Sequence, residues 1–272
     1  MIWRFRSVSN THPLSLAAAT ILDADHVTAV DVARAAGFDA LGLRWDVAAD
    51  REVSPERLRR SIDDAGLRLL DLEVVRLDPN TPFDEHRRLI EIAAQLRPAW
   101  LVTVSHHPDP CRTRDELLLL AESIAPFGCS ISLEFMAFTA IATLAEALSI
   151  AAAARADGGH NIGVLVDALH LDRSGGAPAD LRGTSDGDLS YLQLCDVLTK
   201  PSRARHDPEQ LAFEARNLRR FPGEGTLPLA DLVAQVPAVM PLSVEVQSRQ
   251  WAGRSPLARA HHAMTTIRRF VE

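Results

Sequence analysis

The chain has 272 residues, of which 47% are hydrophobic and 24% charged, and its formal net charge is −7. This size and composition are ordinary for one large globular domain, and the negative charge argues against a basic surface that binds nucleic acid. No apolar run reaches the roughly 18 residues of a membrane span, and Arg4 and Arg6 interrupt any signal-peptide core. The three cysteines show no CxxC spacing, so neither a disulfide framework nor a zinc knuckle is indicated. We therefore expect a cytoplasmic protein with neither a nucleic-acid nor a membrane partner.

The first half of the chain alternates short apolar runs with helical patterns. The expected helix at 23–37 ends at a glycine, and the next helix has Ser54 as its N-cap and Pro55 at its first helical position. Runs of strand length that are rich in Val, Leu and Ile lie between the helical patterns. We expect a first apolar segment at 13–22, strands at 38–43, 67–75, 100–104 and 129–135, and helices at 23–37, 54–65, 83–96, 113–126 and 144–154.

The second half begins with a buried strand that ends in polar residues. The apolar run at 163–166 leads into Asp167, and His170 follows three residues later. A carboxylate at the end of a buried strand is costly unless an arginine, a lysine or a metal ion receives it. The stretch at 198–221 is long and irregular, with a short helix expected near 209–219, and long loops of this kind often act as lids. Further strands are expected at 190–196 and 242–246, and further helices at 228–236 and 258–271.

This alternation predicts the fold class. Eight short buried strands that alternate with helices over about 270 residues are typical of an α/β protein with a single (β/α)₈ TIM barrel. The main competitor is a doubly wound sheet, but GxGxxG does not follow the first strand and GxxxxGK[ST] is absent from the sequence. No linker rich in Pro, Gly or Ser divides the chain. We therefore expect one TIM-barrel domain over residues 1–272.

Polar side chains occupy late positions in four consecutive expected strands, namely Glu134, Asp167, Gln193 and Glu245. In a barrel the C-terminal ends of the strands converge on the face where catalysis takes place. Three carboxylates in one place repel one another unless they take up protons or bind a cation. Their oxygens and the amide oxygen suit Mg²⁺ or Mn²⁺ better than structural zinc. Taken singly, each residue has an ordinary alternative as a helix cap, as a partner for a nearby arginine or as a satisfied buried amide.

Other polar residues near the strand ends are candidates for contacts with a substrate. The planar fork of Arg216 suits a carboxylate or a phosphate, although a solvated helix charge is an equal alternative. Arg173, in the loop expected after the sixth strand, either binds substrate oxygens or stabilises the loop. His106 follows the fourth expected strand, where it lines a pocket or remains an ordinary loop residue. Arg44 and Glu73 hold comparable positions after the second and third strands.

Five motifs together resemble a known family. They are SLEF, VDALHLDRSGG, YLQLCD, RRFPGEGTLPL and PLSVEV, and their order and spacing span essentially the whole chain. The chain resembles the xylose isomerase-like TIM-barrel superfamily, which comprises sugar phosphate isomerases and epimerases and includes family-2 apurinic endonucleases. The resemblance implies one divalent metal ion, Mn²⁺ or Mg²⁺ with Co²⁺ or Zn²⁺ as alternatives. Its ligands would be Glu134, Asp167, Gln193 and Glu245.

The resemblance also implies an activity. It is that of an isomerase or epimerase that removes a proton next to a carbonyl of a small sugar or polyhydroxy keto substrate, including a sugar-like polyol or keto acid, through a metal-stabilised enediolate. Glu134 and Glu245 are expected as base and acid, and His170 is expected to face the substrate and to bond with it or transfer a proton. A homodimer is common in the family, but the residues leave the oligomeric state open.

One residue departs from the epimerase pattern. Ketose epimerases of the family more often carry His where this chain has Gln193, and Gln193 together with the FPGEG segment resembles 3-dehydroshikimate dehydratases. The alternative function is therefore dehydration of a cyclic hydroxy-ketone of the 3-dehydroshikimate or inosose type on the same metal site. A zinc nuclease is disfavoured by Gln193 and by the acidic charge, and a barrel that only binds a ligand is a further alternative.

Overall fold

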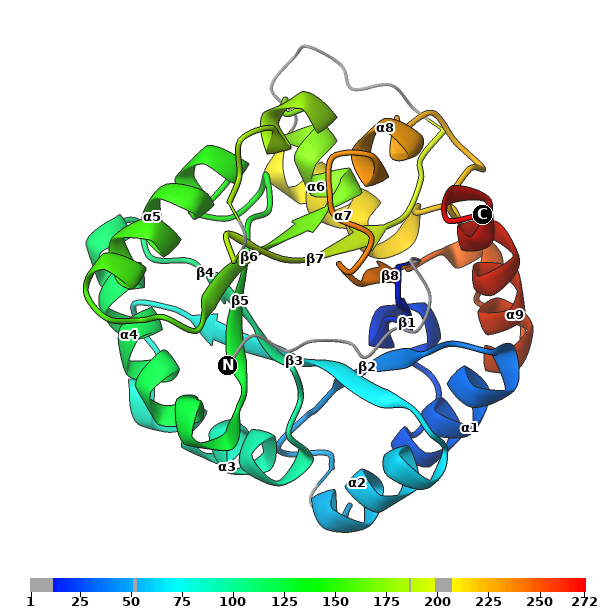
Figure 1. The fold of residues 1–272 in the computed structure, drawn as a ribbon, viewed down its shortest axis with the longest axis horizontal. Helices are drawn as coiled ribbons and strands as arrows, with labels where there is room; N and C mark the ends of the chain where they lie inside the picture. The colour runs from blue at the N-terminus through cyan, green and yellow to red at the C-terminus, as the bar shows by residue number, and fades with distance from the viewer. Residues whose placement is uncertain (1–11, 51–52, 186, 199–206) are drawn as a thin grey trace.

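The computed structural model describes residues 12–50, 53–185, 187–198 and 207–272. The signal-peptide expectation, which concerned the N-terminus, and residues 199–206 of the long loop lie outside this part. Within it, eight parallel strands form a closed barrel in which each strand pairs with the next and β8 pairs with β1 (Figure 1). The strands are β1 (Leu14–Leu16), β2 (Ala40–Arg44), β3 (Arg68–Leu77), β4 (Trp100–Ser105), β5 (Ser130–Glu134), β6 (Ile162–Asp167), β7 (Leu189–Leu194) and β8 (Leu242–Val244). The predicted (β/α)₈ barrel is confirmed.

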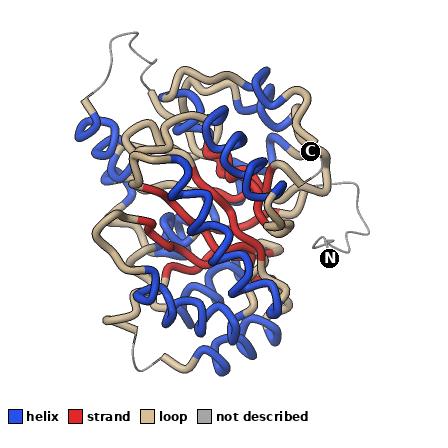
Figure 2. The backbone as a smooth tube through the Cα atoms, turned by 90° about the vertical axis from the view of Figure 1, so that its left-hand side faces the viewer, coloured by secondary structure: helices blue, strands red, loops and turns tan. Residues whose placement is uncertain are grey.

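Helices surround the ring of strands, so that the strands lie at the centre of the molecule (Figure 2). Local signals set several helix ends, since Asp25 and Ser54 accept hydrogen bonds from backbone N–H groups at helix starts and Thr143 forms a capping box with Glu146. The α-helices are α1 (His26–Ala36), α2 (Pro55–Asp64), α3 (Arg87–Leu96), α4 (Pro110–Ile124), α5 (Leu144–Ala156), α6 (Ala168–Arg173), α7 (Pro208–Asn217), α8 (Leu229–Val233) and α9 (Pro256–Ile267). None of the helices in the described part is long and apolar enough to cross a bilayer.

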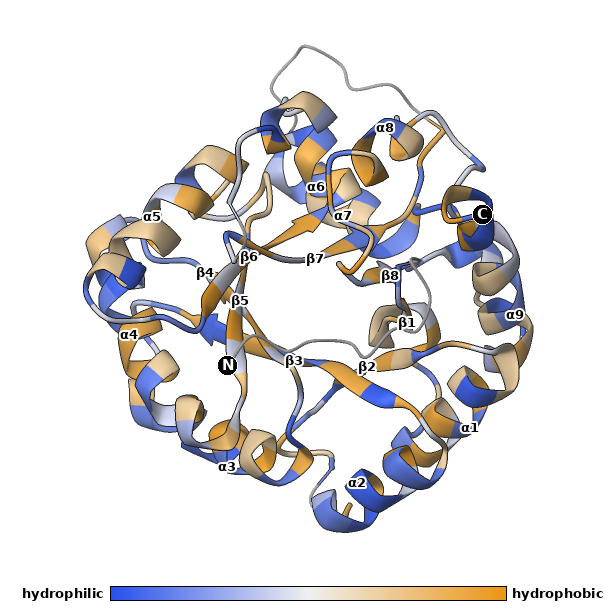
Figure 3. Ribbon diagram, viewed as in Figure 1, coloured by the Kyte–Doolittle hydropathy of each residue, from blue (hydrophilic) through white to orange (hydrophobic). Residues whose placement is uncertain are grey.

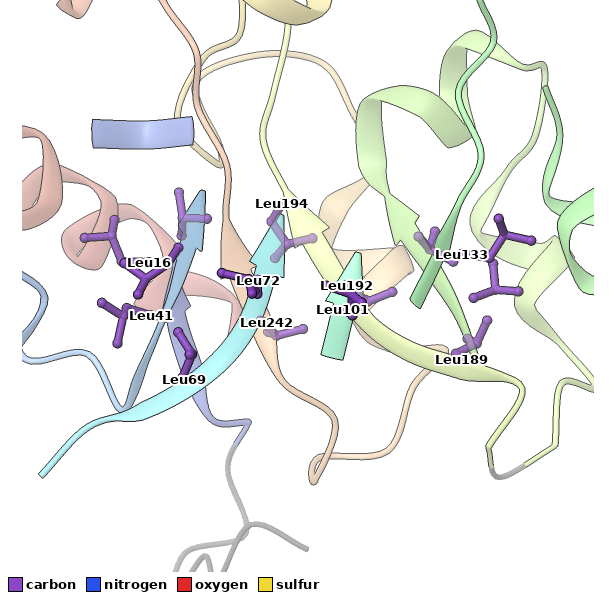
Figure 4. Close-up of a cluster of buried hydrophobic side chains, with 14 of the residues drawn as sticks. Leu16, Leu41, Leu69, Leu72, Leu101, Leu133, Leu189, Leu192, Leu194 and Leu242 are labelled. Atoms are coloured by element: carbon purple, nitrogen blue, oxygen red, sulfur yellow. The ribbon is translucent and has the colours of Figure 1, made fainter. Parts of the chain in front are cut away.

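The main hydrophobic core lies between the strands and the helices. The strands are largely apolar while the helices are mixed (Figure 3), as expected for parallel strands covered on both sides and for helices with one buried face. Leucines from most of the strands join this core; the buried ones labelled in Figure 4 include Leu16, Leu41, Leu72, Leu133 and Leu192. Each leucine that is fully buried contributes roughly 1.5–3 kcal/mol.

The inside of the barrel is more polar than this outer core. A small apolar layer of Ala40, Leu70, Val102, Leu165 and Tyr191 fills one level. Nearer the C-terminal ends of the strands, the inward-facing residues are polar. Their direction follows from the strand, because side chains two positions apart point to the same face. The inward pairs that result are Ser132 with Glu134, Leu165 with Asp167, Tyr191 with Gln193, and Ser243 with Glu245.

Asp71 of β3 is a fully buried carboxyl group inside the barrel. Burial, with Glu73 nearby, raises its pKa well above the usual range. The side chain lies against Gly42 of the neighbouring strand, where a Cβ would be only 2.4 Å from Asp71 Oδ1. Glycine is therefore required at position 42 by the close approach of a side chain.

One local expectation was wrong. A loop was expected after Asp167, but α6 (Ala168–Arg173) begins there directly. The Asp167 carboxylate accepts hydrogen bonds from the N–H groups of Leu169 (2.8 Å) and His170 (3.0 Å), so one residue both ends β6 and caps the helix. The short helix expected near 209–219 is confirmed as α7.

Candidate active site

A cavity of about 120 Å³ opens at the C-terminal ends of the strands, and charged side chains dominate its lining. We call Glu134, Asp167 and Glu245 the acidic cluster. We call Arg76, His106 and Arg216 the basic mouth. The charged residues that line the cavity itself are Arg44, Arg76, Arg216, Arg219, Glu73, Glu134 and Glu245.

The barrel brings the four predicted metal ligands to one side of this cavity. Glu134 ends β5, Asp167 ends β6, Gln193 lies in β7, and Glu245 directly follows β8. In the strand pairing Asp167 is opposite Gln193. Glu134 and Glu245 line the cavity, while Asp167 and Gln193 are buried beneath it.

Arg219 lies within the acidic cluster. Its Nη1 is 2.6 Å from Asp167 Oδ2 and 3.0 Å from Glu245 Oε2, and only 3% of the residue is exposed. Burial alone would raise the pKa of Asp167, but Arg219 and His170 hold it below its usual range. The cation that the Asp167 carboxylate requires is therefore an arginine in this structure.

The positive charge of Arg219 does not fully balance the acidic cluster. Burial raises the pKa of Glu134 well above the usual range, with Glu245 and Asp167 adding to the effect. Burial also raises the pKa of Glu245, to about 7. The side-chain oxygen of Gln193 is buried and has no hydrogen-bond partner in the described part of the chain.

These features fit a divalent cation, since three carboxylates and an unpaired amide oxygen form a hard oxygen donor set that lacks positive charge. As the side chains stand, no group of three or more His, Cys, Asp or Glu within the described residues is placed to hold a metal ion. Arg219 lies between two of the donors and would have to withdraw from them for an ion to bind. The metal ligands thus stay a prediction, supported by the chemistry of the donor set.

His170 projects from α6 into the cavity beside the acidic cluster. Its Nε2 lies 3.8 Å from Glu134 Oε1 and accepts a hydrogen bond of 3.4 Å from Arg219 Nη2. The ring of Phe138 meets it edge-on at 5.5 Å. Burial lowers the pKa of His170 to about 4, so the ring is neutral near pH 7. The ring is therefore a neutral hydrogen-bonding group at the predicted substrate position.

Arg44 and Glu73 face the opposite side of the cavity and pair with each other. The Arg44 Nε donates to Glu73 Oε2 at 2.9 Å, and Arg44 Nη2 lies 2.5 Å from the same oxygen. The second Glu73 oxygen is buried and has no hydrogen-bond partner among the described residues.

The remaining predicted site residues are placed differently. Arg216 lines the cavity, whereas His106 lies beside it and is exposed. Arg173 lies outside the cavity lining, because its guanidinium binds Glu214 of α7 at 2.7 and 2.8 Å and also contacts Asp172. This arrangement makes Arg173 a link between α6 and α7, the second of the two roles that the sequence left open.

Sequence reasoning missed two cavity residues, Arg219 and Arg76. Arg219 belongs to the RRFPGEG motif, but its position depends on isolated backbone bridges between Leu218 and Ser248 and between Asp196 and Arg220, which no local pattern indicates. Arg76 lies in β3 beyond two register shifts, so simple alternation does not reveal that it faces the cavity. The one sequence signal for Arg76 is that a charged residue lies near the C-terminal end of the apolar run that forms β3.

Comparison with solved structures supports this architecture. The chain superposes with a TM-score of 0.79 on a xylose isomerase-like TIM barrel/4-hydroxyphenylpyruvate dioxygenase fusion protein, at 19% identity over 94% of this chain, and it spans 42% of the fusion protein. It matches the IolI protein with a bound zinc atom at TM-score 0.79 and 18% identity, over 95% of this chain and 98% of the other. The D-allulose 3-epimerase of Methylomonas sp. in complex with D-allulose matches at TM-score 0.73 and 15% identity, over 96% and 98%. At these identities the matches show the fold alone.

Family membership rests on a separate comparison. A search of curated proteins found no match. The family model described as xylose isomerase-like TIM barrel, by contrast, matches residues 30–269, which is most of the chain. The chain therefore belongs to the xylose isomerase-like TIM-barrel family.

Proposed function

We propose that this protein is a divalent-metal-dependent isomerase or epimerase that moves a proton next to the carbonyl of a small polyhydroxylated substrate. The observation that carries the proposal is the acidic cluster beside the unpaired Gln193 oxygen at the base of the cavity. Glu134, Asp167, Gln193 and Glu245 would hold the ion. When bound, a divalent cation polarises a substrate carbonyl and stabilises the negative charge that forms on its oxygen.

The residues of the chain supply the proton transfer. Glu134 and Glu245 come from β5 and the end of β8, and both have raised pKa values. A carboxyl group whose pKa approaches neutrality is suited to take a proton in one step and return it in another. His170 and Arg219, which line the cavity beside these two groups, would orient substrate oxygens by hydrogen bonding.

Relatives of known chemistry support this class of reaction. One structural neighbour is an epimerase of the ketose D-allulose, and another contains a zinc atom. The hard oxygen donors of this chain favour Mn²⁺ or Mg²⁺, and Co²⁺ or Zn²⁺ remain alternatives. We place the reaction in the cytoplasm, as the sequence suggested.

The proposal is tested by metal analysis followed by proton exchange. The purified protein is loaded in turn with each of the four metals and incubated in D₂O with ketoses, inosose and dehydroshikimate. Deuterium that enters one compound, detected by NMR, identifies the carbon acid, and removal of the metal with a chelator should stop the exchange. No exchange with any metal-loaded sample, or undiminished exchange after chelation, would contradict the proposal.

Dehydration is the second candidate, and Gln193 favours it because this residue departs from the ketose epimerase pattern. After the same proton abstraction, a β-hydroxyl leaves instead of a proton returning. The hydroxyl must leave as water, so the neutral His170 ring would have to take a proton from protonated Glu134, 3.8 Å away, and pass it to the departing oxygen. His170→Asn distinguishes the two reactions. It should abolish loss of water from a dehydratase substrate but leave deuterium exchange measurable.

A further inference from the structure

Two arginines in the lining of the cavity have no ion-pair partner among the described residues. Of the four arginines in its lining, Arg44 pairs with Glu73, and Arg219 pairs with the acidic cluster. Arg76 and Arg216 form no hydrogen bond or ion pair with any residue of the described chain. The guanidinium groups of these two arginines, unpaired among the described residues, are therefore available to bind a ligand.

These two arginines and His106 are close enough to affect one another. Burial lowers the pKa of Arg76, and the charges of Arg44 and Arg216 lower it further, while Glu134 and Glu73 oppose the effect. Burial likewise lowers the pKa of His106, and both Arg76 and Arg216 add to the effect while Asp78 opposes it. Arg76 and Arg216 thus place two like charges near each other beside His106, and an anion would relieve their repulsion.

The backbone explains how the basic mouth is assembled. Arg76 is paired with Val104 in the ladder between β3 and β4, and the N–H of His106 donates to the carbonyl of Leu77 at 2.8 Å. These contacts fix Arg76 and His106 on adjacent strand ends. Arg216 reaches the same cavity from the last turn of α7. Arg76 and His106 therefore come from the C-terminal ends of two paired strands, and Arg216 comes from α7.

We propose that Arg76 and Arg216, with His106 beside them, bind an anionic group of the substrate, so that the substrate is a carboxylate or a phosphate ester rather than a neutral sugar. This inference rests on the proposed function only in identifying the bound anion as part of the substrate, because binding of the anion does not require turnover. An anion in the basic mouth would direct the rest of the molecule toward the acidic cluster across the cavity. The basic mouth would then set specificity, while the acidic cluster carries out the reaction.

The expected strength follows from the type of contact. Arginine binds carboxylate and phosphate through two parallel N–H···O bonds, which are about twice as strong as neutral ones. Loss of one such charge-assisted contact weakens binding by roughly tenfold to a hundredfold. Replacement by lysine keeps the charge but loses the fork, and should weaken binding less than replacement by glutamine.

The experiment measures binding to metal-loaded protein by calorimetry with three probes: D-fructose, 2-keto-D-gluconate and D-fructose 6-phosphate. The second probe replaces a neutral hydroxymethyl group of fructose by a carboxylate, and the third adds a phosphate, so the two anion sources are distinguished. We expect at least one anionic probe to bind at least tenfold more tightly than fructose. Arg76→Gln and Arg216→Gln should each remove most of this preference without changing the affinity for fructose.

Arg34→Gln is the matched control, because Arg34 is an exposed arginine of α1 that does not line the cavity. This variant makes the same change in charge and should retain the preference. Equal affinity for all three probes, or a preference that survives in the Arg76→Gln, Arg216→Gln double variant, would overturn the inference. Binding and exchange measured on the wild type separate the two proposals: anion preference without proton exchange contradicts only the reaction, and exchange without anion preference contradicts only the basic mouth.

Discussion

The acidic cluster and the basic mouth differ in whether the protein itself neutralises their charge. The acidic cluster lies at the ends of β5, β6 and β8, is buried, and contains its own cation in Arg219. The basic mouth lies at the ends of β3 and β4 and on α7, is open to solvent, and contains no anion among the described residues. The acidic cluster is thus partly neutralised within the protein, whereas the counter-charge of the basic mouth is absent from the described residues.

Burial explains why the two regions are built differently. An isolated charge in the barrel interior is very costly, so the carboxylates there must be paired, protonated or bound to a metal ion. At the mouth, solvent partly compensates the arginines, which can therefore remain unpaired until a ligand arrives. The following experiments test this distinction, beginning with the largest expected effect.

Glu245→Gln removes a proposed proton-transfer group while preserving the size of the side chain. Loss of a general acid or base typically lowers the rate by about 10²–10⁴-fold, so we expect turnover to become undetectable while metal content is largely kept. Deuterium exchange by NMR and elemental analysis measure the two quantities. A rate near that of the wild type would show that Glu245 is not the base or the acid.

Arg219→Met removes the internal cation from the acidic cluster. Asp167, which is fully buried, would lose its paired charge, and breaking such a pair lowers the free energy of unfolding by about 3–5 kcal/mol. Urea denaturation of the metal-free protein measures the loss, and added Mn²⁺ should restore much of it by replacing the missing positive charge. A metal-free variant as stable as the wild type would show that Arg219 is not needed as a counter-charge.

The affinity for Mn²⁺ should depend on pH because of Glu245. Burial raises its pKa to about 7, so below that pH the carboxyl group is mostly protonated in the folded protein and a metal ion must displace the proton. Affinity should therefore increase as pH rises to about 7, by roughly tenfold per unit for the proton displaced from Glu245, and Glu134, whose pKa burial also raises, should add to the increase. Calorimetry between pH 5 and pH 8 measures the profile, which should become flatter in Glu245→Gln.

Arg173→Gln provides the smallest expected effect and separates a structural arginine from a binding one. Arg173 joins α6 to α7 through its two hydrogen bonds to Glu214, so its loss should lower the free energy of unfolding by roughly 1–3 kcal/mol. Arg216→Gln should change stability by less than about 0.5 kcal/mol. Anion preference should respond in the opposite way and be lost only in Arg216→Gln. Equal effects of the two variants on stability would contradict the distinction.

Sequence patterns were sufficient for the barrel and for the acidic cluster, because both follow from short-range periodicity. Apolar runs mark the strands, and a polar residue late in a strand must lie near the C-terminal face. The helix after Asp167 was not predicted, because a helix cap was treated as an alternative to a metal ligand and not as a second action of the same carboxylate. Capping and ligation use the same oxygen atoms, so sequence alone does not separate them.

The arginines could not be placed in the same way. Arg219 depends on two isolated bridges, from Leu218 to Ser248 and from Asp196 to Arg220, that bring an irregular segment against the barrel. Arg76 depends on the register of β3, which shifts twice. Arg173 and Arg216 were both candidates for contacts with a substrate, and only their tertiary partners distinguish them. Long-range contacts thus decide which arginine is structural and which is free.

The contact between Gly42 and Asp71 has a consequence for how relatives of this barrel can diverge. Since a Cβ at position 42 would lie 2.4 Å from Asp71 Oδ1, neither position can change freely while the other stays the same. An alanine at 42 would require a smaller or differently oriented residue at 71. In an alignment of relatives, positions 42 and 71 should therefore covary. Because this constraint comes from packing inside the barrel, the covariation should not depend on which substrate each relative uses.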